Sequence, residues 1–243
     1  MVIHVGRISA IFRYPVKSMA GESVDVAQLG WHGIEGDRRF AFRRLSDKSG
    51  FPWLTAGRLP ELILYRPFRN IDDGAIAPTH VQTPTGDRFE LFSEALRDDI
   101  SRRFGSAVEL MQMNHGIFDE ASISIINLTT LQSIEHTIGR SIDIRRFRPN
   151  IVIETFESKP FAEDAWVGRK LTFGSDTNAA IQVTMPDPRC SMINLDPDTA
   201  TPDPAVMQAV VRLNQNNAGA YGTVVGAGEI RVGQTVSLMA ESE

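Results

Sequence analysis

Four short segments of the chain carry residues whose types and spacing could do chemistry, and the first two are cationic. Lys17 and Ser18 follow Pro15, which fixes the local backbone, and an ammonium beside a hydroxyl suits a phosphate or another anion. Arg38 leads out of the glycine-rich turn 33–37 into an expected strand, where a side chain turned inward needs an anionic partner. Two interpretations stay open. The cations bind a ligand, or Lys17 lies in a solvated loop and Arg38 pairs with Asp37.

The third segment has three arginines within residues 145–148 and leads directly into an apolar strand expected at 151–153. Arg148 precedes a proline, which predicts an extended backbone at that residue. Asn150 offers both a donor and an acceptor, a combination that suits the polar edge of a ring. The alternative is a basic cluster on the surface.

The fourth segment holds the only cysteine, Cys190, in a loop constrained by Pro188. A neighbouring cation such as Arg189 favours the thiolate, which is the form that binds metals and acts as a nucleophile. A single cysteine is otherwise a small, buried, apolar residue, so both roles stay open on the residues alone.

Composition and cysteine content exclude several classes of protein. The 243 residues include 25 Lys and Arg against 30 Asp and Glu, a formal net charge of −5, so we expect no nucleic-acid polymer as partner. A single cysteine excludes an intrachain disulfide, a cysteine-only zinc site and a cysteine-ligated iron–sulfur cluster. No apolar stretch approaches 18 residues and charges interrupt the N-terminus, so we expect no membrane association, no secretion signal and a cytoplasmic location.

Three helices are expected from their start and stop signals. The signal pairs are Ser93 with Gly105, Asn127 or Thr129 with Gly139, and Asp203 with the stretch 214–219. The third helix is expected to bury Val206, Val210 and Leu213 at helical spacing.

Short strands with Gly and Pro in the turns dominate the rest of the chain. They are expected at 2–13, 23–29, 39–45, 107–113, 123–126, 151–154, 170–174, 179–185, 223–225, 229–232 and 235–239. Because a regular βαβ alternation is absent, we expect a mainly β protein with a few helices (α+β), built on antiparallel barrels. Residues 1–105 and 106–243 are expected to form two tightly packed domains, with the functional site at their junction.

Taken together, these segments resemble the MOSC-domain proteins that carry an N-terminal MOSC β-barrel module, the family of the amidoxime-reducing component and its bacterial counterparts. The resemblance covers nearly the whole chain and rests on the order and spacing of short motifs. They include Tyr14-Pro15-Val16-Lys17-Ser18, Gly33-Ile34-Glu35-Gly36-Asp37-Arg38, Phe147-Arg148-Pro149-Asn150, Arg189-Cys190 and Asp196-Pro197-Asp198-Thr199. The resemblance implies a β-barrel-like module over 1–105 packed on an antiparallel MOSC barrel over 106–243.

The resemblance also implies a molybdenum cofactor, a pterin dithiolene that carries a phosphate. In the family a cysteine thiolate is the protein ligand to molybdenum. Cys190 matches that position and is therefore the expected catalytic and metal-binding residue. The other positions expected to contact the cofactor are Lys17, Ser18, Arg38, Arg148, Asn150, Asp119 and Ser122.

The implied activity is the reduction of small N-oxygenated (N-hydroxylated) substrates such as amidoximes. Electrons would come from a separate ferredoxin, flavoprotein reductase or cytochrome-b5-like partner, because the chain has no cysteines for a cluster of its own. The cofactor would carry the redox chemistry, and the protein would supply orientation and electrostatics. Two alternatives remain: a sulfur or molybdenum-cofactor carrier with a persulfide on Cys190, and a non-catalytic barrel that binds a phosphorylated ligand.

Overall fold

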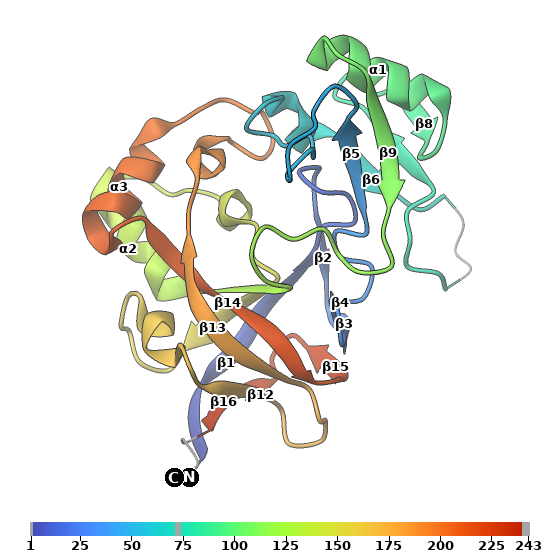
Figure 1. Cartoon of the computed structure of the whole chain (residues 1–243). Coiled ribbons are helices and arrows are strands. Elements are labelled where there is room, and N and C mark those ends of the chain that lie inside the picture. Colours follow the sequence, from blue (N-terminus) through green and yellow to red (C-terminus); the bar gives the residue numbers. More distant parts are fainter. Residues whose placement is uncertain (1, 71–73, 240–243) are drawn as a thin grey trace.

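The computed structural model describes residues 2–70 and 74–239, and strands dominate them (Figure 1). The strands are β1 (Val2–Arg13), β2 (Glu22–Val24), β3 (Val26–Gly30), β4 (Gly33–Ile34), β5 (Phe40–Arg44), β6 (Arg66–Phe68), β7 (His80–Gln82), β8 (Arg88–Glu90), β9 (Val108–Gln112), β10 (Ile123–Asn127), β11 (Ile151–Thr155), β12 (Lys170–Phe173), β13 (Ala180–Pro188), β14 (Asn217–Gly226), β15 (Gly228–Arg231) and β16 (Thr235–Met239). The α-helices are α1 (Glu94–Phe104), α2 (Leu128–Ile138) and α3 (Pro204–Asn214). Short 3-10 helices are η1 (Pro60–Leu64), η2 (Ile144–Phe147), η3 (Ala162–Trp166) and η4 (Ser191–Asn194). Among these described segments, no helix has the length and apolar character that a membrane span requires.

Seven strands form a closed barrel, which occupies the lower part of Figure 1. Their order around the barrel is β1, β11, β10, β14, β13, β12 and β16, and β16 pairs with β1 to close it. Within residues 2–70 and 74–239, the only parallel pair of the barrel is β10 with β11, because α2 carries the chain between them. The expected mainly β fold with an antiparallel barrel is confirmed.

The barrel interior is filled by residues two apart along each strand, since alternate side chains face the same side. Ile123 and Ile125 of β10 pack with Ile151 and Ile153 of β11 in one buried cluster. Each such side chain stabilises the fold by about 1.5–3 kcal/mol when fully buried. A closed, filled barrel gives a rigid rim on which a site can be built.

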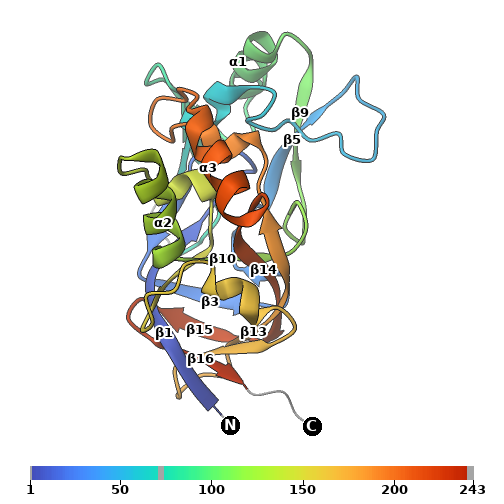
Figure 2. The same cartoon turned by 90° about the vertical axis from the view of Figure 1, so that its left-hand side faces the viewer.

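A smaller module built from β5 to β9 and α1 lies at one end of the barrel (Figures 1 and 2). Here β5 pairs with β9, β6 to β8 form a second sheet, and a separate core includes Phe42, Leu62, Tyr65 and Ile100. The sheet β15–β3–β4 connects the two parts, because β15 follows the barrel strand β14 and β4 precedes β5. The expected boundary after residue 105 follows α1 directly and stays a prediction, while β1 lies in the barrel with strands from the second half of the chain.

The helix signals in the sequence act largely as expected. Ser93 caps α1 by accepting from the Leu96 N–H, and Asn127, not Thr129, caps α2. The expectation that Leu213 is buried in α3 is wrong, since this side chain is 36% exposed. Asn214, four residues after Val210, takes the inward position and donates to Asp164 Oδ2 at 2.7 Å. The helix ends at Asn214, within the stretch 214–219 expected to end it, and β14 begins at Asn217.

Candidate functional site

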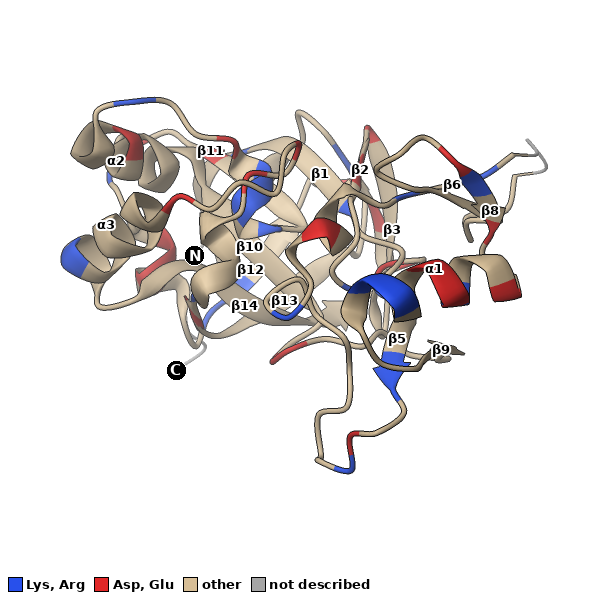
Figure 3. Ribbon diagram, turned by 90° about the horizontal axis from the view of Figure 1, so that it is seen from above, with Lys and Arg blue, Asp and Glu red and all other residues tan. Residues whose placement is uncertain are grey.

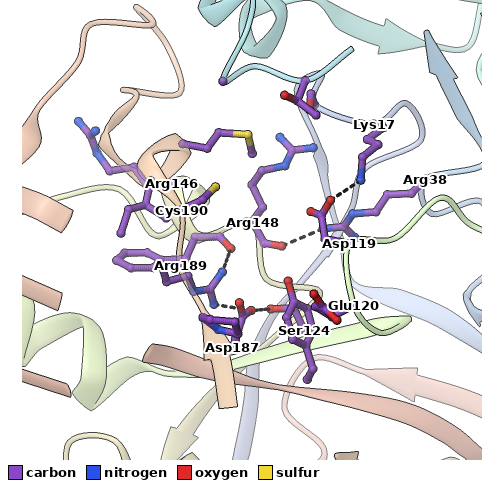
Figure 4. Close-up of a pocket in the computed structure, with 18 of the residues that line it drawn as sticks. Lys17, Arg38, Asp119, Glu120, Ser124, Arg146, Arg148, Asp187, Arg189 and Cys190 are labelled. Atoms are coloured by element: carbon purple, nitrogen blue, oxygen red, sulfur yellow. Dashed lines mark hydrogen bonds and ion pairs between the residues drawn. The ribbon is translucent and has the colours of Figure 1, made fainter. Parts of the chain in front are cut away.

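A pocket of about 350 Å³ lies between the barrel and the smaller module, where the sequence placed the site (Figure 4). Segments far apart in the chain line it: the turn after β1, the loop before β10, η2, and the end of β13 with η4. Its lining includes three carboxylates and five cationic residues, which are Lys17, Arg38, Arg146, Arg148 and Arg189. On α1, outside the pocket, basic and acidic residues lie together (Figure 3), whereas cations outnumber carboxylates in the pocket lining.

Lys17 is a buried cation held by a carboxylate that faces solvent. Its side chain is 4% exposed, and Nζ donates to Asp119 Oδ1 at 2.7 Å and to the Ile117 carbonyl at 3.1 Å. Burial lowers the pKa of Lys17, and the Asp119 carboxylate opposes that effect. The Asp119 side chain is 63% exposed, so this carboxylate can turn into solvent and leave Lys17 to another anion.

Arg38 and Arg148 both pack on the ring of Tyr14, with their guanidinium carbons 4.8 and 4.2 Å from its centroid. Arg38 forms an ion pair with Asp37 and donates from Nη2 to the Arg148 carbonyl at 3.1 Å. Arg148 donates from Nη1 to the Met19 carbonyl at 2.8 Å, and no ion pair joins it to a carboxylate in the described residues. Burial lowers the pKa of Arg148 to about 10. Arg148 is therefore a half-buried cation that lacks an ion pair with a carboxylate among the described residues.

Lys17, Ser18, Arg38 and Arg148 form one side of the pocket, which we call the cationic wall. Three of these residues have a left-handed backbone, a conformation that residues other than glycine rarely adopt. The φ angles of Ser18, Arg38 and Arg148 are 65°, 48° and 50°. A left-handed backbone costs a residue with a side chain roughly 1–2 kcal/mol, and such residues gather at functional sites. The predicted extended backbone at Arg148 is wrong, because Arg148 ends η2 and its N–H donates to the Arg145 carbonyl.

Two of the predicted contact residues lie outside the pocket lining. Asn150 is buried beneath it, where Oδ1 accepts from the Ser124 N–H at 3.1 Å and Nδ2 donates to Asp37 Oδ2 at 3.0 Å. It therefore fixes the carboxylate that holds Arg38. Ser122 precedes β10, and its carbonyl packs against Gly33. Direct contacts from Asn150 and Ser122 to a ligand stay predictions.

Cys190 lies across the pocket from Lys17, two residues after the end of β13 (Figure 4). The cysteine is exposed, so its thiol is not the small buried residue that the sequence left open. Its neighbour Arg189 is 8% exposed, and its Nη2 lies 2.7 Å from Asp187 Oδ2. The same guanidinium donates to two backbone carbonyls at 2.6 and 2.7 Å. Arg189 thus anchors the loop that presents the thiol.

Sequence reasoning missed the floor of the pocket. Asp187 is 1% exposed and accepts from Ser124 Oγ at 2.8 Å, and Tyr221 of β14 also lines the pocket. Burial raises the pKa of both Asp187 and Tyr221. The register in which β14 pairs with β13 and β10 brings Tyr221 to this place, and no local sequence signal reveals that register.

Comparison with known proteins supports the resemblance that the motifs suggested. Two family models match the chain: the MOSC domain over residues 92–237 and the MOSC N-terminal beta barrel domain over residues 5–113. The mitochondrial amidoxime reducing component 2 of Bos taurus is 25% identical over 241 residues, covering 82% of this chain and 69% of the bovine protein. The YUAD protein from Bacillus subtilis shares the fold, with a TM-score of 0.55, 14% identity, and coverage of 100% of this chain and 99% of that one. Because the MOSC model spans more than half of the sequence, the chain belongs to the MOSC domain family.

Proposed function

We propose that the pocket binds a molybdenum cofactor through Cys190 and that the chain reduces small N-hydroxylated compounds with electrons from a separate redox partner. MOSC domains are associated with this cofactor, and the bovine relative is named for amidoxime reduction. One observation carries the proposal: an exposed thiol faces buried and half-buried cations, Lys17, Arg38 and Arg148, across a single pocket.

The residues present fit such a group in size, charge and access. The volume of about 350 Å³ lies within the range of cofactor and ligand sites. On the cationic wall, Lys17, Arg38 and Arg148 exceed the two carboxylates that pair there by one charge. A phosphate would supply the missing negative charge. The thiol of Cys190 is exposed, so a metal can reach it.

Each residue then has a definite task. Lys17, Ser18 and Arg148 would bind the anionic end of the group, and Asp37 would keep Arg38 oriented beside them. Cys190 would bind the metal, and the cofactor when bound supplies the electron-transfer chemistry. Reducing an N–OH bond to N–H consumes two electrons and two protons and releases water. Burial raises the pKa of Tyr221, so its hydroxyl keeps its proton beside the pocket.

The test measures molybdenum per chain by elemental mass spectrometry, on protein from cells that make the cofactor, together with amidoxime reduction by an added electron donor. Wild type should carry close to one molybdenum and be active. Cys190→Ser should stay folded and lose activity, because the protein ligand to the metal is gone. Arg212→Gln, at an exposed position of α3, is the matched control and should change neither readout.

Two results would overturn the proposal. Activity retained in Cys190→Ser would remove the cysteine from the reaction. Absence of molybdenum from wild-type protein, with the cofactor pathway working and a persulfide found on Cys190, would replace the reductase with a sulfur carrier.

A further inference from the structure

A second, smaller cavity adjoins the pocket at Arg148. Its volume is about 30 Å³, and it shares Arg146, Arg148 and Met192 with the larger pocket. Tyr14, Ala20 and Gly21 also line it. Since a single water needs roughly 10–15 Å³, the space suits one chloride-sized ion or two waters.

Three side chains that line this cavity have a buried polar atom with no hydrogen-bond partner among the described residues. The atoms are Tyr14 Oη, Arg146 Nε and Arg148 Nη2. Tyr14 is 1% exposed and Arg146 is 8% exposed. Burial raises the pKa of Tyr14 to about 12, so its hydroxyl keeps its proton. All three atoms are therefore donors, and burying donors without an acceptor is unfavourable.

The charges around the cavity also favour an occupant that accepts hydrogen bonds. Three arginines line it, and the described part of its lining includes no carboxylate. Two of them are neutralised from outside: Arg145 by Asp143 and Asp198, each at 2.6 Å, and Arg146 by Asp196 at 2.9 Å. Arg148 has no such ion pair in residues 2–70 and 74–239. An occupant is needed that accepts several hydrogen bonds and carries negative charge.

We propose that this cavity binds a small inorganic anion of chloride size, held by Tyr14 Oη, Arg146 Nε and Arg148 Nη2. Waters carry no charge, and each of the one or two waters that fit would bring two hydrogens that need acceptors of their own. An anion accepts from all three donors, and its charge strengthens each of these hydrogen bonds. The inference rests on this cavity alone and not on the proposed reductase.

Such an anion would stabilise more than one guanidinium. Arg146 also donates from Nη1 to the Asn194 carbonyl at 2.8 Å, at the end of η4. The η4 segment begins directly after Cys190. A bound anion would therefore fix Arg148 on the ring of Tyr14 and, through Arg146, the loop that presents the thiol.

The first experiment follows thermal unfolding of the full chain at constant ionic strength while gluconate is replaced by chloride or bromide. Tm should rise with halide and reach a plateau, because a ligand bound only by the folded state stabilises it by mass action. Tyr14→Phe removes one of three donors, so its apparent halide affinity should fall about tenfold. Without halide, Tyr14→Phe should be at least as stable as wild type, since the hydroxyl then has no partner.

Tyr65→Phe is the matched control. Tyr65 is equally buried, but its hydroxyl donates to Asp99 at 2.5 Å in the smaller module. This variant should lose stability to the same extent in gluconate and in bromide. Crystals grown in bromide should show an anomalous peak in the cavity. A halide response that is equal in wild type and Tyr14→Phe, or density for water alone in the bromide crystal, would overturn the proposal.

Discussion

Ser18, Arg38 and Arg148 hold left-handed backbone conformations around one pocket, and contacts outside it hold the two arginines. Arg38 is held by Asp37, and Arg148 by the Met19 carbonyl and the ring of Tyr14. Strained residues persist only where the surrounding structure determines them. The strained backbone at these three residues therefore lowers the stability of the fold, and it places their polar groups at the pocket.

Ser18→Gly tests that trade directly. Glycine adopts a φ of 65° without strain, so the variant should gain about 0.5–1 kcal/mol in free energy of unfolding after the entropy of the unfolded chain is counted. It should also carry less molybdenum, because a hydroxyl is lost from the pocket. Denaturant unfolding and elemental analysis measure the two effects. Gln215→Gly, with a φ of 50° at the end of α3, should gain stability with no loss of molybdenum, and a parallel loss there would refute the link.

Lys17→Met tests the cationic wall. The variant removes a charge-assisted contact, worth about 1.5–3 kcal/mol, so bound molybdenum and pterin should fall about tenfold or more. Stability should change little, because the exposed Asp119 carboxylate can turn fully into solvent. The amount of pterin released when the protein is denatured measures how much cofactor was bound. Lys48→Met, in an exposed loop, should behave as wild type. If Lys17→Met kept full occupancy, Lys17 would not bind the cofactor.

At this scale, local sequence signals were sufficient for the residues that lie within one short segment. Lys17, Arg38, Arg148 and Cys190 were predicted, and the structure brings their side chains to one pocket. Asp187 and Tyr221 were missed because strand register, not a motif, brings them there. The backbone of Arg148 was predicted wrongly because its preference before proline yields to the contacts of its own side chain.

Among the elements, the first turn of α2 is hydrogen-bonded to a buried carboxyl group of η3. Glu163 of η3 is fully buried and accepts from Thr130 Oγ1 at 2.9 and 3.0 Å and from the Asn127 N–H at 3.4 Å. Burial raises the pKa of Glu163 from 4.5 to about 7. The same Asn127 caps α2, so this carboxyl group connects the helix start to η3.

We expect the stability of the protein to fall as pH rises from about 5 to 7.5. Below pH 4.5 the Glu163 carboxyl is protonated in both the folded and the unfolded chain. Between that pH and about 7 the unfolded carboxyl ionises while the folded one keeps its proton, so the free energy of unfolding decreases by up to about 3 kcal/mol. Urea unfolding across this range measures it.

Glu163→Gln should flatten this pH dependence and raise stability at pH 8. Glu157→Gln, at an exposed position, is the control and should leave the slope unchanged. An identical slope in wild type and Glu163→Gln would show that other groups cause the dependence. Helix boundaries could be predicted from capping residues such as Ser93. The burial of Glu163 against α2 could not be predicted, because it depends on tertiary packing.

For the whole molecule, the first strand, β1, connects the two halves of the chain because it pairs with strands of the second half. β1 lies between β11 and β16 and then continues into the turn that carries Lys17. Strand positions could be predicted from local patterns, but the two barrel partners of β1, the strands β11 and β16, lie at least 140 residues away and could not. We therefore expect the barrel and the smaller module to unfold in one transition, with circular dichroism and tryptophan fluorescence coinciding.

Gly6→Ala is the sharpest test of this closure. A Cβ at Gly6 would come within 2.3 Å of the Glu154 carbonyl oxygen, at the end of the β1–β11 pairing where Gly6 pairs with Thr155. Because backbone must move, the free energy of unfolding should fall by about 2 kcal/mol or more. Gly50→Ala, with nothing within 4 Å, should be neutral. A Gly6→Ala protein in which only one half melts early would contradict a shared transition.

The pairing of β1 with β16 has a mechanical consequence. Val2 is the pairing partner of Met239, so both described ends of the chain lie at the same edge of the barrel (Figure 1). A force that pulls these ends apart acts across the two strands rather than along them. Their hydrogen bonds then bear the load one pair after another, never all together. A barrel that melts as a single unit on heating would therefore open under a small force in an optical trap, beginning at the seam between its first and last strands.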